Sequence, residues 1–178
     1  RIRALRDFGD VKAGDVGGWI EKEENLSYEG NCWVYDEAKV YGSAIVRGSA
    51  VVRDSAVVRD SAVVYGSAIV RGSAVVGGSA IVEDSAVVRD SAVVRGSAVV
   101  YGSAVVRTTE DYIAIGPIGS RCGITTVFRT TDGVKIRCGC FYGSISEFEA
   151  KVKETHGDNQ YAKEYLALAE LLKIRFGE

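Results

Sequence analysis

The sequence has few of the residues that mark a disulfide scaffold, a membrane span or a polyanion partner. Its four cysteines are too few for a dense disulfide framework in a chain of 178 residues, so we expect reduced thiols. No apolar run approaches the ~20 residues needed to cross a bilayer, and no charged-then-apolar leader is present. The net charge of −2 supplies no positive excess for nucleic acid. These absences predict a cytoplasmic protein without a membrane partner, and they disfavour nucleic acid.

The sequence is rich instead in a repeated six-residue phrase, of which the copy from Ser49 to Asp54 reads SAVVRD. Each copy holds a small residue, usually alanine, and a larger apolar residue two positions later. Because side chains alternate across a strand, both point to one face. The glycine or aspartate and the serine that follow favour turns. Each hexad therefore predicts a short strand and a turn, and the small positions are Leu26, Cys32, Ala38, Ala44, Ala50 and every sixth residue to Ala104.

Such short strands need partners, and a stack of fixed period supplies them. The pattern of aliphatic, turn and small residues, as in VRDSAV from Val52 to Val57, resembles the hexapeptide-repeat left-handed β-helix family. The resemblance implies three hexads in each triangular coil, and coils ~4.8 Å apart. It predicts a mainly β fold: a left-handed parallel β-helix, a three-sided solenoid of about four coils, with a small C-terminal α+β domain.

The ends of the chain differ from the repeat. The stretches GGWIEKEENLSYEGNCWVYDEAKVYG and KVKETHGDNQYAKEYL are similar to hexapeptide-repeat proteins of bacterial and bacteriophage genomes, a likeness that implies the fold and no particular activity. We expect an extended N-terminal segment to lay Trp19 over the first coil, because an open sheet edge invites aggregation. The predicted units are residues 1–25, an N-terminal capping segment; residues 26–107, the β-helix; and residues 108–178, an α+β module with a β-hairpin and two helices.

The hairpin is expected in the stretch ITTVFRTTDGVKIRCGCF. A three-residue loop at 131–133 would place Thr126 and Phe128 on one face with Ile136, whereas a two-residue loop would place Val127 and Arg129 there instead. The apolar pattern favours the longer loop. A capping box at 144–147 then predicts a helix that ends near Gly157, and Asp158 or Asn159 is expected to cap a second helix.

Hexapeptide-repeat enzymes include acyltransferases, which need a histidine base, and carbonic anhydrases, which need three histidines for zinc. The repeat in this chain has no histidine, and His156 lies beyond it. We therefore predict a protein that is not an enzyme, with no catalytic residue, no metal and no cofactor. The leading hypothesis is a structural or assembly scaffold with a C-terminal recognition module. A hexapeptide-type acyltransferase ranks third.

The second hypothesis is a sequestering protein, of the kind that a phage uses against host defence, for a small anionic ligand or a nucleotide. The stretch IGPIGSRCG from Ile115 to Gly123 offers Ser120, Arg121 and free backbone N–H groups, which suit a phosphate or carboxylate. The alternative is an ordinary turn. A zinc site built from His156 and three cysteines is disfavoured, because free cysteine is usually buried. The candidate ligand-binding residues are Ser120, Arg121 and His156.

The outward residues of the repeat form columns. One column holds Arg53, Arg71, Arg89 and Arg107, and we expect the neighbouring Asp36, Asp54 and Asp90 to neutralise it rather than a nucleic acid. The most apolar outward ladder instead predicts a homo-oligomer, with a trimer implied by the family resemblance, because contiguous exposed aliphatic surface marks interfaces. The alternative is that these residues only satisfy strand propensity. The interface residues would be Ile45, Val63, Tyr65, Ile81, Val99 and Tyr101.

Overall fold

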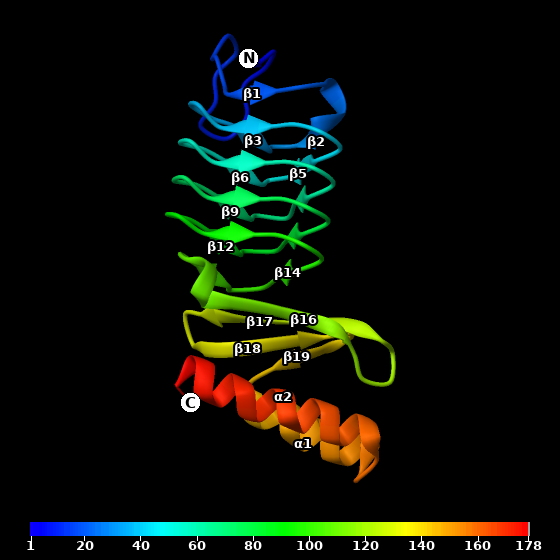
Figure 1. Cartoon of the computed structure of the whole chain (residues 1–178). Helices are drawn as coiled ribbons and strands as arrows, with labels where there is room; N and C mark the ends of the chain where they lie inside the picture. Colours follow the sequence, from blue (N-terminus) through cyan, green and yellow to red (C-terminus); the bar gives the residue numbers. More distant parts are fainter. Residues whose placement is uncertain (178) are drawn as a thin grey trace.

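The computed structural model describes residues 1–177, which form a three-sided parallel β-solenoid with an α+β module stacked on its last coil (Figure 1). Each side of the solenoid is a five-stranded parallel sheet. The first sheet contains β1 (Trp19–Ile20), β4 (Lys39–Val40), β7 (Val57–Val58), β10 (Val75–Val76) and β13 (Val93–Val94). The second contains β2 (Leu26–Gly30), β5 (Ile45–Gly48), β8 (Val63–Val64), β11 (Ile81–Val82) and β14 (Val99–Val100). The third contains β3 (Trp33–Val34), β6 (Val51–Val52), β9 (Ile69–Val70), β12 (Val87–Val88) and β15 (Val105–Val106).

The coil period follows from the strand register. Val57 pairs with Val75, and Val75 pairs with Val93, so each residue meets its partner three hexads further along the chain. The predicted fold class, a three-sided parallel β-helix with a C-terminal α+β domain, is confirmed. The solenoid has about five turns rather than about four, because β1 already pairs with β4, with Trp19 opposite Lys39.

The interior of the solenoid is filled by stacked alanine and valine ladders. From Val34 to Val106 these ladder residues are at most 1% exposed. Small alanine side chains alternate with larger valine side chains, so the three sheets pack closely around one axis and leave no room for a ligand. The inside of the solenoid is therefore structural, and any recognition takes place on its surface or at its ends.

Aspartates at the corners of the coils accept backbone hydrogen bonds from the next coil. Asp54 has a left-handed backbone with φ of 63°, and its Oδ2 accepts the backbone N–H of Gly72 in the next coil at 2.7 Å. Asp60 accepts the N–H of Gly78 in the same way at 2.8 Å. Within residues 1–177, the arginine column has one ion pair to its neighbouring aspartates, Arg89 to Asp90 at 3.8 Å. The corner carboxylates thus connect successive coils more than they neutralise arginines.

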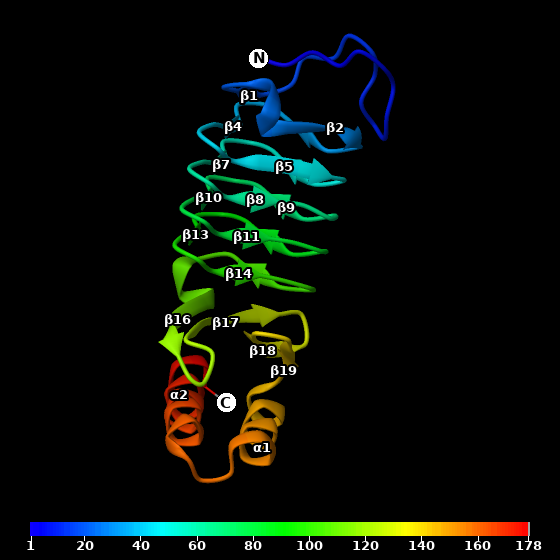
Figure 2. The ribbon, with the colours of Figure 1, turned by 90° about the vertical axis from the view of Figure 1, so that its right-hand side faces the viewer.

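The segment before β1 forms an arm at the N-terminal end (Figure 2). Trp19 does not cover the first coil as predicted, because it points outward from β1 and is 45% exposed. Its indole Nε1 donates to Glu37 Oε2 at 3.2 Å. Trp33 takes the expected packing role, with Phe8 of the arm against it at a ring distance of 5.4 Å.

The C-terminal module is a four-stranded antiparallel sheet covered by two helices, and the sheet lies between the last coil and the helices (Figures 1 and 2). The short helical turns η1 (Glu23–Asn25) and η2 (Thr109–Asp111) lie near the two ends of the solenoid. The elements of the module are β16 (Tyr112–Ile118), β17 (Gly123–Thr130), β18 (Gly133–Cys138), β19 (Phe141–Gly143), α1 (Ile145–His156) and α2 (Gln160–Phe176).

Strand β17 closes the open end of the solenoid. The backbone N–H of Val99 donates to Thr126 Oγ1 at 3.0 Å, and Ala104 forms an antiparallel bridge with Thr130. Phe128, fully buried, packs into the end of the ladder core. These contacts satisfy an edge that would otherwise present unpaired backbone groups.

The predicted hairpin register is wrong. Thr130 pairs with Gly133 and Val127 with Ile136, so the loop is two residues long and Val127 shares the helix-facing side with Ile136. Phe128 faces the solenoid instead. The apolar alternation misled the prediction because both faces of this sheet are covered, one by the last coil and one by the helices.

The helices begin and end close to the predicted residues. Ser144 caps α1 with the predicted capping box, and Gly157 ends it. Asn159, rather than Asp158, caps α2, with its side chain accepting the N–H of Ala162. Over residues 1–177, neither helix has the length and apolar character to cross a bilayer.

Candidate functional site

A cavity of about 580 Å³ lies in the C-terminal module, between the β16–β17 turn, the end of β18 and helix α1. The three predicted ligand-binding residues, Ser120, Arg121 and His156, all line it. Ser120 and Arg121 are adjacent in the sequence and His156 is distant from them, so folding brings the turn and the end of α1 together. The other lining residues are Ile118, Gly123, Ile124, Cys138, Gly139, Cys140, Phe141, Tyr142, Phe148, Lys151, Val152, Thr155 and Tyr165.

The turn that carries Ser120 and Arg121 is fixed to helix α2. The N–H of Gly119 donates to Glu164 Oε2 at 2.9 Å. Gly119 has φ of 68°, and a Cβ there would overlap the hydroxyl of Tyr165. Only glycine allows both this left-handed backbone and this close approach. The turn is therefore held in place by the helix, and its two candidate residues are presented at the cavity.

The charged groups around the cavity have one sign. Its cations are Arg121 and Lys151, His156 also lines it, and no aspartate or glutamate does. Within residues 1–177, the guanidinium of Arg121 has no acidic partner, whereas Lys151 has an exposed ion pair with Glu154 at 3.0 Å. The walls are apolar, with Ile118, Ile124, Phe141, Phe148 and Val152. Such a site suits a ligand with an anionic end and an apolar portion.

A network of hydroxyl groups and a thiol lies beside these charges. Thr125 Oγ1 donates a hydrogen bond to Cys138 Sγ at 3.1 Å. Burial is the main cause that raises the pKa of Tyr165, and the nearby Cys138 adds to the rise. The ring of His156 lies 5.7 Å from the ring of Tyr165. Tyr165 thus packs against the predicted residue His156 and lines the same cavity as Ser120 and Cys138.

Sequence reasoning missed Cys138, Lys151 and Tyr165 as site residues. Cys138 and Tyr165 belong to apolar patterns that predict burial, and both are indeed packed against the helix-facing core. The expectation that the module's cysteines are buried is wrong for Cys122 and Cys140, which are exposed, while Cys138 is half-buried. Both of the exposed cysteines lie in or beside turns at the sheet's ends, where side chains reach solvent.

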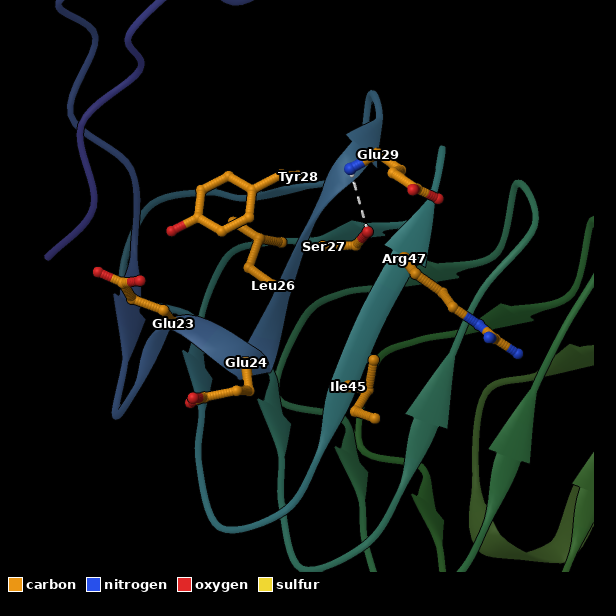
Figure 3. A pocket seen from close by; sticks show the side chains of 8 residues that line it. All are labelled: Glu23, Glu24, Leu26, Ser27, Tyr28, Glu29, Ile45 and Arg47. Atoms are coloured by element: carbon orange, nitrogen blue, oxygen red, sulfur yellow. Dashed lines mark hydrogen bonds between the residues drawn. The ribbon is translucent and has the colours of Figure 1, made fainter.

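A second hollow, of about 540 Å³, lies on the second sheet at the N-terminal end (Figure 3). Figure 3 shows the carboxylates of Glu23 and Glu24 on one side and the guanidinium of Arg47 on the other. Its apolar surface comes from Leu26 and Ile45. The acidic groups make it opposite in charge to the C-terminal cavity, and it contains neither histidine nor cysteine. The remaining lining residues are Ser27, Tyr28 and Glu29.

The predicted interface residues form a continuous ladder along the second sheet. Ile45 pairs with Val63, Val63 with Ile81, and Ile81 with Val99. Arg47 lies 4.7 Å over the ring of Tyr65. Tyr101 is partly covered by the C-terminal module, because Tyr142 packs edge-on against it at 5.2 Å. The oligomeric state itself stays a prediction.

No protein-family model matches the chain. A curated protein of Escherichia coli (strain K12), named Uncharacterized acetyltransferase YdcK, is 52% identical to it over 40 residues. The match covers 22% of this chain and 12% of that relative. The relative's name contradicts our prediction that the protein is not an enzyme, and we drop that prediction. That prediction rested on the absence of histidine from the repeat, whereas His156 lines a cavity of the C-terminal module. The register of three hexads per coil makes the fold similar to that of hexapeptide-repeat β-helix proteins, and the match to a protein named as an acetyltransferase fits this resemblance.

Proposed function

We propose that the solenoid is a scaffold and that the C-terminal cavity binds a small anionic molecule carrying an acyl group, which the protein transfers. The observation that carries this proposal is the charge of the cavity: the cations Arg121 and Lys151 line it without any acidic residue. The name of the similar protein, an acetyltransferase, supports acyl transfer as the reaction.

The shape and lining of the cavity fit a donor of the acyl-coenzyme A type. Phosphate oxygens would bind the guanidinium of Arg121, which forms paired, charge-assisted hydrogen bonds with such groups. The neutral arm of the donor would lie along the apolar wall formed by Ile118 and Phe148. Drug-sized and cofactor-sized ligands occupy cavities of roughly 300 to 1,000 Å³, and this cavity, at about 580 Å³, falls in that range.

His156 is the candidate general base. It is the one histidine in the sequence, and it lines the cavity from the last residue of α1. An imidazole takes a proton from an acceptor nucleophile near neutral pH, which no residue of the valine and alanine ladders does. The acceptor substrate would approach His156 from the open side of the cavity.

A second candidate function is ligand capture without turnover. His156 has ring contacts with Tyr161 and Tyr165, but no carboxylate of residues 1–177 is hydrogen-bonded to its imidazole. Catalytic histidines are usually oriented by such a partner. This observation favours a sequestering role, in which the cavity holds the anion and releases it unchanged.

Calorimetry and turnover assays separate these functions. Acetyl-coenzyme A, coenzyme A and inorganic pyrophosphate would be titrated into the wild type, the Arg121→Ala variant and an Arg95→Ala control, whose side chain is exposed on the solenoid. We expect binding that Arg121→Ala weakens and Arg95→Ala preserves. Chromatographic detection of coenzyme A release with a panel of amine acceptors then tests transfer, which His156→Ala is expected to abolish. Absence of binding by the wild type would refute both functions.

A further inference from the structure

We propose that Glu164 is a positioning residue for the anion site, because it fixes the turn that presents Ser120 and Arg121 to the cavity. This inference rests on the proposed function, and it adds the group that sets the geometry of the site. Glu164 lies in the second turn of α2 and is half-buried. Among residues 1–177, no acidic residue lines the cavity, so Glu164 acts from behind the turn without touching the ligand.

The turn is built around Gly119. Its carbonyl oxygen accepts the backbone N–H of Cys122 at 3.1 Å, which closes a four-residue turn with Ser120 and Arg121 at its centre. Its own N–H donates to Glu164 Oε2 at 2.9 Å. Both backbone groups of this one residue are used, since one shapes the turn and the other attaches it to α2.

The carboxylate of Glu164 is itself held in one orientation. Gln160 Nε2 donates to Glu164 Oε1 at 3.2 Å, which leaves Oε2 for Gly119. Both side chains come from α2, which is capped by Asn159 and packed on the sheet of the module. A charged acceptor binds a backbone N–H more strongly than a neutral one does. The turn is therefore attached to a rigid element by a charge-assisted hydrogen bond.

The segment around Gly119 needs such an attachment. Gly116 and Gly123 lie on either side of it, and glycine has more accessible backbone conformations than any other residue. Tyr165, the next residue of α2, lies so close to Gly119 that a Cβ there would overlap its hydroxyl. This contact keeps the turn from moving towards the helix, and the hydrogen bond to Glu164 keeps it from moving away.

The position of Arg121 depends on this attachment. Its guanidinium lies beside the backbone of Gly139, where an added Cβ would be 3.9 Å from Nη1, and Gly139 also lines the cavity. A turn that is free to change conformation would present the guanidinium there for only part of the time. The apparent Kd of an anion rises in inverse proportion to that fraction.

The test compares two substitutions that remove the same charge. Glu164→Gln keeps a side-chain oxygen that accepts the N–H of Gly119, whereas Glu164→Ala removes the acceptor. Calorimetric titration with inorganic pyrophosphate and with coenzyme A should give a Kd about fivefold higher for Glu164→Ala than for Glu164→Gln, which is the effect of one hydrogen bond. The matched control is Glu170→Ala, because Glu170 is an exposed residue of the same helix that accepts a hydrogen bond from Lys173. It should bind as the wild type does.

Hydrogen exchange of the free protein adds a measurement that needs no ligand. The amide of Gly119 should exchange about fivefold faster in Glu164→Ala than in the wild type, because one hydrogen bond is lost, and Glu164→Gln should keep its protection. The amide of Val75, which donates to Ala92 O inside the solenoid at 2.9 Å, should not change. A variant that had only lost global stability would instead show faster exchange at both amides.

The outcomes separate this inference from the function on which it rests. If the wild type binds both ligands but Glu164→Gln and Glu164→Ala share one Kd, the positioning role is overturned and the proposed function stands. An equal gain in affinity in both variants would also overturn it, since Glu164 would then act only through its charge. If the wild type binds neither ligand, the proposed function fails, and exchange at Gly119 alone decides whether Glu164 holds the turn.

Discussion

Glu83 Oε1 lies 3.4 Å from Arg137 Nη2, and this ion pair joins a corner of the solenoid to strand β18 of the C-terminal module. Glu83 is only 6% exposed. The guanidinium of Arg137 also lies 5.5 Å over the ring of Tyr101. A buried carboxylate is stable in its charged form only with such a partner, so the contact couples the two parts of the fold.

The first prediction concerns this pair. Arg137→Met keeps the apolar stem but leaves the Glu83 carboxylate buried without its cation, and we expect a loss of about 3 kcal/mol in the free energy of unfolding at neutral pH. Urea denaturation measures it. The double variant Glu83→Gln/Arg137→Met should recover most of the loss, because no uncompensated charge remains. A single variant as stable as the wild type would contradict the coupling.

The pH dependence of the same site has a defined sign. Burial is the main cause that raises the pKa of Glu83 above 4.5, with Asp84 adding to the rise and Arg137 opposing it. Because the pKa of Glu83 is raised in the folded state, its protonated carboxyl contributes stability that is complete below pH 4.5. This stability is lost as the pH rises through the folded-state pKa. Relative to Glu83→Gln, the wild type should therefore lose stability over that window. Parallel curves for the two proteins would refute this.

The second prediction concerns the N-terminal arm at high pH. Tyr35 donates its hydroxyl to Asp10 Oδ1 at 2.7 Å, and burial with this contact raises the pKa of Tyr35 from 10.0 to about 12. The stabilisation is complete below pH 10 and is lost as pH rises through about 12. Tyr35→Phe should remove this part of the alkaline dependence of urea denaturation, and Tyr41→Phe should not. Identical dependence in wild type and Tyr35→Phe would exclude the contact as its source.

The third prediction concerns the corner at Asp54. Asp54→Ala places an alanine at a left-handed backbone position with φ of 63°. It also removes the carboxylate that accepts the hydrogen bond from the backbone N–H of Gly72. We expect a loss of about 1 to 3 kcal/mol. Asp54→Gly should cost less, because glycine adopts this backbone freely and occupies the equivalent corners at Gly48 and Gly66. Thermal unfolding compares the two, and equal losses would show that the carboxylate bond, which both variants lack, decides the cost rather than the backbone.

The fourth prediction concerns self-association through the second sheet. Val63→Lys/Val99→Lys places two charges on the outward ladder that pairs Ile81 with both residues. We expect light scattering to show the wild type as an oligomer and this variant as a monomer, because burying unpaired lysines is costly. The control, Val57→Lys/Val93→Lys, changes the first sheet instead. A monomeric wild type would end the proposal, and a monomer from the control alone would move the interface to that sheet.

Several features of the fold followed from local sequence. The alternation of alanine and valine, with turn residues between, predicted both the period and the interior, because a strand's side chains alternate whatever surrounds it. Ser144 predicted the start of α1 for a similar reason, since a cap satisfies backbone groups within one turn. The glycine-rich stretch at Ser120 and Arg121 does form an exposed turn that lines a cavity, while its role in ligand binding stays a prediction.

Contacts between distant segments decided the rest. The sequence alone determined which residues are apolar, but only the tertiary structure decided that Phe128 faces the solenoid and Val127 the helices, because a sheet covered on both faces has no polar side to reveal its orientation. It also decided that His156 and Cys138 border one cavity, and that Glu83 is buried against Arg137. Each of these depends on the docking of the C-terminal module against the last coil or against its own helices, and such long-range packing leaves no periodic pattern in the chain.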